Sequence, residues 1–485
     1  MAPGALFSAR SSLQKLDPSP VPVETAINSQ NYLFNRSAKH PPLRVVRGFG
    51  NYYKLEDGST VYDASCGAAV CGLGRYDVRV EEAMIEEMRL GLSYVPSLGF
   101  DTEISASLAQ SLITSTDGEL NKAVFYGSGS EAAEAALKIA IQYHVREKEF
   151  PEPSRTMFIA RERSYHGATL GALDVSGHTA RKALYKDILK DNVSLLSPCY
   201  PYRDRQGRTD EQYVQALKDE LEAEIQRLGP HNVAGFIMEP IVGAALGCVA
   251  AVEGYMSAMR EVCDKHGIIL VFDEVMCGMG RTGKLHAWQH EGVVPDVQLI
   301  GKGLAGGFQA ISGMLVGAKI VDAFENGSAN GAFNHGHTFQ NFPLACAAAL
   351  AVQKIIQDDH LLDNVKAKGQ SLEKKLRKRL GGHRNVGDIR GKGLFWGIEF
   401  VQDKQSKMPF LRKDTVAENL YHKGLCMPGG GIHIYPGAGT VDGINGDHII
   451  IAPAYNITDG EVDFIVSRVG KLIDDFFNDF NYSRE

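Results

Sequence analysis

Short apolar runs with the character of strands alternate with helical patterns through the middle of this 485-residue chain. KAVFYG precedes a helical pattern over residues 131–148, VAGFIMEP precedes one over residues 255–266, and GIILVFDEV and PDVQLIGKG follow. Strands that alternate with helices pack as a mostly parallel sheet with helices on both faces. We therefore predict an α/β fold whose ligands bind at the carboxyl ends of the strands.

The length of the chain predicts more than one packed unit, since 485 residues exceed what a single core usually holds. We expect residues 1–75 to form an N-terminal arm and a segment of a smaller domain. Residues 76–345 would form the large domain, and residues 346–485 a C-terminal small domain. Residues 51–64 have the pattern of a hairpin. A long helix is expected from residue 345 to about residue 380, followed by the strands GLFWGIEF and DHIIIAP.

Charge and composition argue against several classes of function. Lys and Arg total 51 against 58 acidic residues and do not cluster, so no nucleic-acid surface is expected. No apolar run reaches the roughly 18 residues of a membrane span. The eight cysteines show no metal-binding spacing, so no metal site is expected. The first 23 residues lack a secretory signal. We expect a cytoplasmic protein, with a mitochondrial presequence as the less favoured alternative.

A glycine-rich turn in FYGSGSEAAEAALK follows one expected strand. Gly127 and Gly129 permit close backbone approach, and Ser128 and Ser130 can cap the next helix. Free N–H groups at a helix start favour an anion such as phosphate. Many such turns bind nothing, however, and this one is not a Walker A loop. It is also not a complete G-x-G-x-x-G fingerprint, because Ala132 occupies the third glycine position.

Three further polar features are expected near strand ends. Asp273 closes IILVFDEV, where a buried carboxylate needs a salt bridge or a partner such as a pyridinium nitrogen. Lys302 ends an apolar run between two glycines, so burial would lower its pKa, unless it is a solvated loop lysine. Tyr165 and His166 either stack on a flat cofactor or pack within a loop. Together with the glycine-rich turn, these features match what an enzyme of pyridoxal phosphate (PLP) must supply.

The chain resembles the class III aminotransferases, which are fold type I PLP enzymes. The most specific match is VFDEVMCGMGRTGKLHAWQHEGVVPDVQLIGKGLAGG, and others are SYHGAT, IMEPIVG, NHGHTFQNFPLACAAAL and IRGKGLFWGIEF. The resemblance implies the fold type I architecture, with a mostly parallel sheet in a large domain and a smaller α+β domain built from both chain ends. It also implies PLP as cofactor and a homodimer with shared active sites.

The resemblance also implies a role for each site residue. Lys302 would form the Schiff-base link to the cofactor and shuttle protons, and Asp273 would keep the ring nitrogen protonated. The remaining cofactor-binding positions are Gly129 and Ser130 at the phosphate, Tyr165, His166, Glu239 and Val275 around the ring, and Thr338 at the phosphate of the partner subunit.

Departures from the family pattern favour the ω-amine:pyruvate branch. Relatives with a glutamate–arginine gate carry an acid where this chain has Ala244, and usually Gln where it has Met276. Arg390 matches the arginine that binds the substrate carboxylate in that gated branch, so it is a candidate for substrate binding. We therefore expect ping-pong transfer of an amino group from an amine or ω-amino compound to a keto acid, with pyruvate as the expected acceptor.

Several alternatives stay open at this stage. An aminomutase or decarboxylase of the same family would use the same cofactor contacts. A dehydrogenase would bind a nucleotide at the glycine-rich turn, but the incomplete fingerprint argues against it. A non-catalytic scaffold on this fold is the fourth possibility, and the combination of Lys302, Asp273 and Thr338 argues against it.

Overall fold

The computed structural model describes residues 32–37, 41–190 and 192–480. The chain divides into two compact units, Met1–Arg44 and Val45–Glu485, and every candidate site residue belongs to the second. The region of the expected presequence, residues 1–23, lies outside the described residues. Among the helices that the structure describes, none combines the length and the apolar character needed to cross a membrane.

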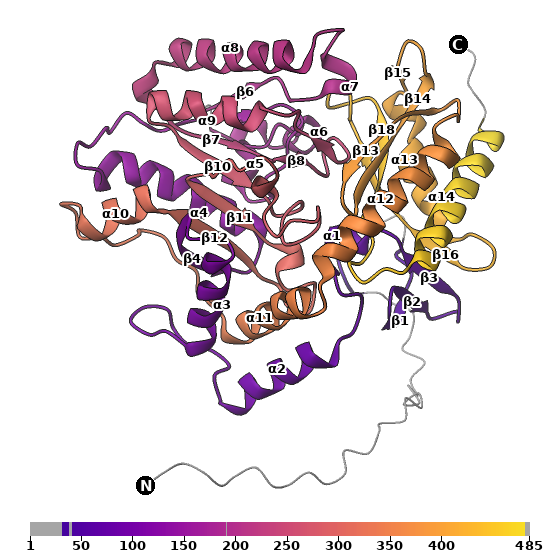
Figure 1. Ribbon diagram of the computed structural model, residues 1–485, viewed down its shortest axis with the longest axis horizontal. Helices are drawn as coiled ribbons and strands as arrows, with labels where there is room; N and C mark the ends of the chain where they lie inside the picture. The colour runs from indigo at the N-terminus through magenta and orange to yellow at the C-terminus, as the bar shows by residue number, and fades with distance from the viewer. Residues whose placement is uncertain (1–31, 38–40, 191, 481–485) are drawn as a thin grey trace. The chain divides into compact units, whose positions relative to one another are not determined.

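A seven-stranded sheet forms the centre of the second unit (Figure 1). Its neighbouring strands β11, β10, β7, β5 and β6 are parallel, whereas β12 runs antiparallel to both of its neighbours, β11 and β4. The mostly parallel sheet is thus confirmed, although β12 was not predicted because the glycines in SGMLVG weaken its strand pattern. In sheet order the strands are β4 (Leu120–Tyr126), β12 (Ser312–Gly317), β11 (Val297–Ile300), β10 (Ile269–Asp273), β7 (Val233–Met238), β5 (Met157–Arg161) and β6 (Val193–Leu196).

Helices pack on both faces of this sheet because its strands are apolar on both sides. On β10, Leu270 and Phe272 join a core with α8 (Asp210–Leu228) and α9 (Tyr255–His266). The alternate residues of β10 join a second core with α4 (Gly129–Gln142). All five β10 residues are buried, so the strand ends at Asp273 with its carboxylate inside the protein.

Three smaller sheets, of four, five and two strands, accompany the central sheet in the described part of the chain. In one, β3 (Thr60–Asp63) pairs in parallel with β16 (Gly431–His433), which joins the two ends of the chain and confirms the smaller α+β domain. The predicted hairpin over residues 51–64 is the antiparallel pair of β2 and β3. The remaining strands are β1 (Val45–Phe49), β2 (Tyr52–Leu55), β8 (Ile241–Val242), β9 (Val249–Ala250), β13 (Val386–Lys392), β14 (Phe395–Asp403), β15 (Met408–Pro409), β17 (Tyr435–Ala438) and β18 (Asp447–Ile451).

Two predicted helices differ in their bounds. The long helix expected from residue 345 is two helices, α11 (Pro343–Asp358) and α12 (Leu361–Leu380), because His360 between them has a φ of 52°. The helix expected from residue 131 starts at Gly129, since the Ser128 side chain caps it. The remaining helices are α1 (Cys66–Ala69), α2 (Val78–Arg89), α3 (Glu103–Thr114), α5 (Leu170–Asp174), α6 (Thr179–Lys182), α7 (Pro201–Asp204), α10 (Ala318–Asn326), α13 (Val416–Leu425) and α14 (Asp459–Asp479).

The packing of β14 against the loop after β8 predicts a sensitive position. A Cβ atom on Gly397 would lie 2.0 Å from the carbonyl oxygen of Gly247, so Gly397→Ala must push two backbones apart. We expect a loss of about 1–3 kcal/mol in the free energy of unfolding, seen as a lower Tm. Gly382→Ala is the control because its Cβ would meet nothing within 4 Å. Equal Tm values for the two variants would contradict this packing.

Candidate active site

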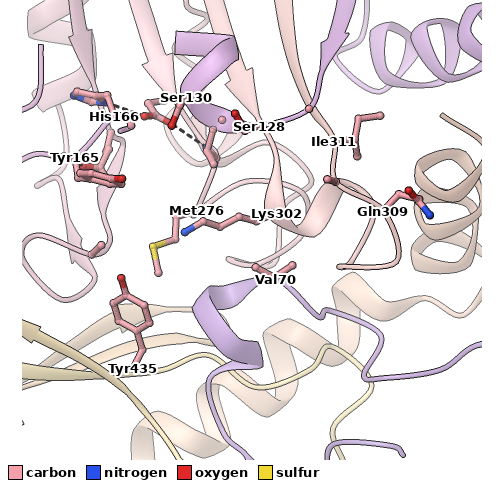
Figure 2. A pocket seen from close by; sticks show the side chains of 18 residues that line it. Val70, Ser128, Ser130, Tyr165, His166, Met276, Lys302, Gln309, Ile311 and Tyr435 are labelled. Carbon is pink, nitrogen blue, oxygen red and sulfur yellow. Dashed lines mark hydrogen bonds and ion pairs between the residues drawn. The ribbon is translucent and has the colours of Figure 1, made fainter. Parts of the chain in front are cut away.

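A pocket of about 330 Å³ lies at the carboxyl ends of the central strands (Figure 2). Figure 2 shows Lys302 extending into it, with Tyr165, His166 and Tyr435 around it. Eight of the residues predicted from sequence line it together, as expected from strand ends that meet at one edge. They are Gly129, Ser130, Tyr165, His166, Glu239, Asp273, Val275 and Lys302.

The glycine-rich turn presents free N–H groups to the pocket. The Ser128 hydroxyl accepts a hydrogen bond from the N–H of Glu131 at 3.3 Å and so caps α4. Ser130 does not cap the helix, since its hydroxyl accepts from the N–H of Ala168 at 2.9 Å. The N–H groups of Gly129 and Ser130 donate to no acceptor in the described part of the chain. The start of α4 therefore fits an anion with several oxygens, such as phosphate.

Gly129 is required here by close packing. A Cβ atom at this position would lie 2.8 Å from Cγ1 of Val275, which also lines the pocket. Gly301 is similarly restricted, because its Cβ would lie 3.2 Å from the same methyl group. Val275 thus packs between the glycine-rich turn and the loop that carries Lys302, and it forms an apolar surface on which a flat ring can lie.

Asp273 faces the pocket from the end of β10. Its Oδ2 lies 2.8 Å from Nδ1 of His166, and its Oδ1 accepts the N–H of Val275 at 3.0 Å. No Lys or Arg in the described ranges forms an ion pair with this carboxylate, and the buried Nε2 of His166 has no partner there. A buried carboxylate with a single histidine partner can still accept a positively charged N–H from a ligand.

Glu239 joins two walls of the pocket. Its Oε1 accepts the N–H of Tyr165 at 3.1 Å and its Oε2 accepts the N–H of Gly243 at 2.9 Å. Burial raises the pKa of this carboxyl group. Glu134 accepts the N–H of Gly171 at 2.8 Å and thereby holds the start of α5 against α4. Both acids therefore position backbone around the pocket.

Lys302 brings a primary amine into this environment. The residue has a φ of 40°, a left-handed conformation that is uncommon for a non-glycine residue. Burial lowers the pKa of its ammonium group to about 8, although the carboxylates of Asp273 and Glu239 oppose the shift. Within the described ranges its Nζ makes no hydrogen bond or ion pair. A larger fraction of this amine is neutral at pH 7–8 than for a surface lysine, and neutral amines attack carbonyl groups.

Other lining residues were not singled out as cofactor contacts. Ala244 and Met276, which mark the departures from the gated branch, both line the pocket, so those departures alter its wall directly. Tyr435 comes from β17 and has no motif around it that indicates a site. The others are Val70, Gly127, Ser128, Gly167, Gln309, Ala310 and Ile311.

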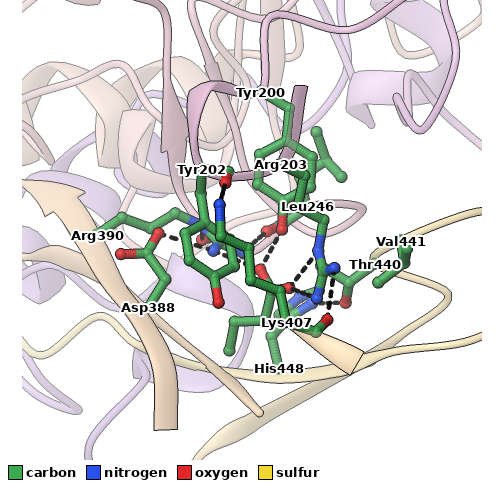
Figure 3. A network of polar contacts seen from close by, with 12 residues as sticks. Tyr200, Tyr202, Arg203, Leu246, Asp388, Arg390, Lys407, Thr440, Val441 and His448 are labelled. Atoms are coloured by element: carbon green, nitrogen blue, oxygen red, sulfur yellow. Dashed lines mark hydrogen bonds and ion pairs between the residues drawn. The ribbon is translucent and has the colours of Figure 1, made fainter. Parts of the chain in front are cut away.

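Thr338 and Arg390 do not line this pocket. Thr338 lies on an exposed loop before α11. Arg390 is on β13, where its guanidinium pairs with Glu399 at 2.5 Å and Asp388 at 3.1 Å and donates from Nε to the carbonyl oxygen of Gly247 at 2.9 Å (Figure 3). The sequence could not indicate this arrangement, because Glu399 comes from the neighbouring strand β14.

A phosphate-sized cradle, a buried carboxylate and a reactive amine thus line one pocket at the carboxyl edge of a mostly parallel sheet. This donor set fits PLP, which carries a phosphate, a basic ring nitrogen and an aldehyde. A fold and a site of this kind define the fold type I PLP enzymes.

Comparison with known proteins identifies the family. The model of the class III aminotransferases matches residues 33–471. An aminotransferase of Gibberella zeae is 47% identical over 90% of this chain and 84% of its own length. An (S)-enantioselective ω-transaminase of Thermomicrobium roseum superposes with a TM-score of 0.83 at 31% identity, covering 92% of this chain and 96% of that one.

A third relative was solved with the cofactor in place. It is an amine transaminase from an uncultivated Pseudomonas species in its PLP-bound form, with a TM-score of 0.84 at 28% identity and coverage of 92% and 98%. The chain belongs to the class III aminotransferase family. It is an aminotransferase with the fold of the fold type I PLP enzymes.

The lowered pKa of Lys302 predicts how a neutral substitute affects stability. The Lys302 ammonium loses its proton more readily in the folded protein than in the unfolded chain. Its positive charge therefore lowers the free energy of unfolding, and this cost is complete below about pH 8. That cost disappears as the pH rises toward the unfolded pKa of about 10.4. We expect Lys302→Met to raise the Tm of cofactor-free protein at pH 7, with a smaller gain at pH 9.5. A gain that grows with pH would contradict the lowered pKa.

Proposed function

We propose that this aminotransferase uses PLP bound at Lys302 to move an amino group from an amine or ω-amino compound to a keto acid, with pyruvate as the acceptor. The observation that carries the proposal is the meeting of the Lys302 amine, the Asp273 carboxylate and the free N–H groups of α4 in one pocket. These are the three contacts that a phosphorylated pyridine aldehyde requires.

Each contact has a separate task in this proposal. The N–H groups of Gly129 and Ser130, at the positive end of α4, would bind the phosphate and fix the cofactor. Asp273 would hold a proton on the ring nitrogen, and its contact with His166 at 2.8 Å keeps the carboxylate in one orientation. Bound PLP would supply an electron sink for the electrons left when a proton leaves the substrate carbon.

Lys302 would be both the attachment point and the proton carrier. When a substrate amine replaces it, its Nζ would stay in the pocket, and a larger fraction of it would be neutral than for a surface lysine because burial lowers its pKa to about 8. It can then take the proton from the substrate carbon and return it to the cofactor side. The same atom would work in reverse when a keto acid enters, which accounts for a ping-pong order.

The wall of the pocket favours pyruvate over 2-oxoglutarate. Ala244 and Met276, which line the pocket, are apolar. The family members with a glutamate–arginine gate carry an acid at the first of these positions and usually a glutamine at the second. A second, distal carboxylate would therefore find no such polar gate at these two positions. Val70 adds another apolar side chain to the lining.

Product stoichiometry tests this function. Wild-type protein with PLP should convert 1-phenylethylamine and pyruvate to acetophenone and alanine in equal amounts, faster than with 2-oxoglutarate. Lys302→Ala should lower kcat by at least about a thousandfold, because both attachment and proton transfer are lost. Borohydride should fix the cofactor on the peptide that contains Lys302. Amine loss without alanine would contradict amino transfer, and a label elsewhere would contradict the attachment site.

We also propose a homodimer in which Thr338 contacts the phosphate of the partner's cofactor. Its position on an exposed loop leaves its hydroxyl available to another subunit. Thr338→Ala should weaken PLP binding by about threefold to tenfold, since one hydrogen bond to a charged group is lost. Ser328→Ala, on an exposed position of the same region, is the control. Sedimentation should give a dimer, and a monomer with full activity would refute the shared site.

A further inference from the structure

A keto acid brings a carboxylate into the pocket, but the lining holds no cation that is free to bind it. The side chains with a formal charge in the lining are those of Glu239, Asp273 and Lys302. The two carboxylates repel a substrate anion, and Lys302 works at the reacting carbon. A keto acid therefore needs a cation from just outside the lining.

Arg390 is not placed to supply this cation. Its Nη1 pairs with Glu399 at 2.5 Å, and its other nitrogens donate to the carbonyl oxygens of Leu246 and Gly247. The Glu399 side chain is fully buried, so withdrawing Arg390 would remove one of the cations that neutralise it. The two carbonyl oxygens belong to the loop that follows Ala244, so Arg390 holds that loop (Figure 3). Arg390 is thus a positioning residue for the pocket wall.

Arg181 is an exposed cation beside the pocket. Its guanidinium carbon lies 4.4 Å from the centre of the Tyr165 ring, and Tyr165 lines the pocket. Its charge also acts on the Lys302 ammonium, which places the guanidinium within electrostatic reach of the reacting end. In the described part of the chain no carboxylate forms an ion pair with Arg181, and its side chain is exposed.

The short helix α6 holds Arg181 in this position. Lys182, the next residue, donates from Nζ to the carbonyl oxygen of Asp174 at 2.7 Å. At the start of α6, Thr179 packs closely against Gly443. A Cβ atom on Gly443 would lie 2.5 Å from Oγ1 of Thr179. The backbone around Arg181 is therefore anchored, while the guanidinium keeps its planar set of N–H donors free. A guanidinium of this kind matches the two oxygens of a carboxylate.

We propose that Arg181 binds the carboxylate of the keto acid substrate, next to the ring of Tyr165, and that Arg390 does not. The inference rests on the proposed function and deepens it, because it assigns the selection of α-keto acids to α6. Tyr165 would then contact two groups. It would contact the cofactor because it lines the pocket, and it would contact the Arg181 guanidinium, which lies against its ring.

Two acceptors that differ by a carboxylate test this assignment in the holoenzyme. Pyruvate and acetaldehyde share a methyl group and a carbonyl, but only pyruvate carries the carboxylate. With 1-phenylethylamine as donor, Arg181→Gln should lower kcat/KM for pyruvate by about tenfold or more, because a charge-assisted pair is lost. It should leave kcat/KM for acetaldehyde within about twofold, and Arg181→Lys should recover part of the loss. Lys186→Gln, an exposed charge just after α6, is the matched control.

The outcomes separate this inference from the proposed function. No amino transfer by wild type to either acceptor would refute the function, whereas equal effects of Arg181→Gln on both acceptors would refute only the role of Arg181. Arg390→Gln should lower both reactions together and lower the Tm; a selective loss with pyruvate there would overturn the assignment. If acetaldehyde turns over too slowly, the inhibition constant of butyrate against pyruvate gives the same test. It should rise by about tenfold in Arg181→Gln and stay unchanged in Lys186→Gln.

Discussion

The contact between Asp273 and His166 holds the centre of the site together. Strand β10 is buried on both faces and ends at Asp273, so the Asp273 carboxylate lies in the protein interior. An unpaired charge would be unfavourable there. The imidazole of His166 supplies a partner on one side, and the pocket leaves the other side open to a ligand cation. The same negative charge acts on Lys302 across the pocket. In the proposed function, a single carboxylate would therefore influence both the cofactor ring and the amine.

The polar network behind the pocket wall has a different purpose. Glu399 is fully buried between Arg390 and Arg203, and Arg390 continues the network to the backbone at Leu246 and Gly247. Removing one partner of such a network leaves a buried charge short of its neighbours, so the network favours one geometry of the loop. On the other side of that loop, Ala244 lines the pocket in which we propose that the reaction takes place.

Sequence patterns were most informative where a motif residue follows a strand directly. Asp273, Lys302 and Gly129 could be placed in one site because alternating strands and helices force their strand ends to one edge of the sheet. Tyr435 could not, because the position of β17 relative to the pocket depends on how a separate sheet packs. The break at His360 was also not predictable, since nothing in its local sequence requires a positive φ.

The role of Arg390 shows a second limit of sequence reasoning. Its motif places it on a strand, but only the neighbouring strand shows that Glu399 occupies its guanidinium. Arg181 had no motif at all, and its place beside Tyr165 depends on the packing of α6 against Gly443. The positions of both arginines depend on contacts between segments that are distant in the sequence. Local sequence patterns do not indicate such contacts.

The pairing of β3 with β16 has a consequence for biosynthesis. The hydroxyl oxygen of Ser65 lies 2.8 Å from Nδ1 of His433, although 368 positions separate the two residues in the chain. Val70, close to one of these strands, and Tyr435, close to the other, line the same cavity. A ribosome must therefore translate the message past residue 435 before that cavity can close, and a nascent chain truncated before residue 431 lacks the strand that pairs with β3.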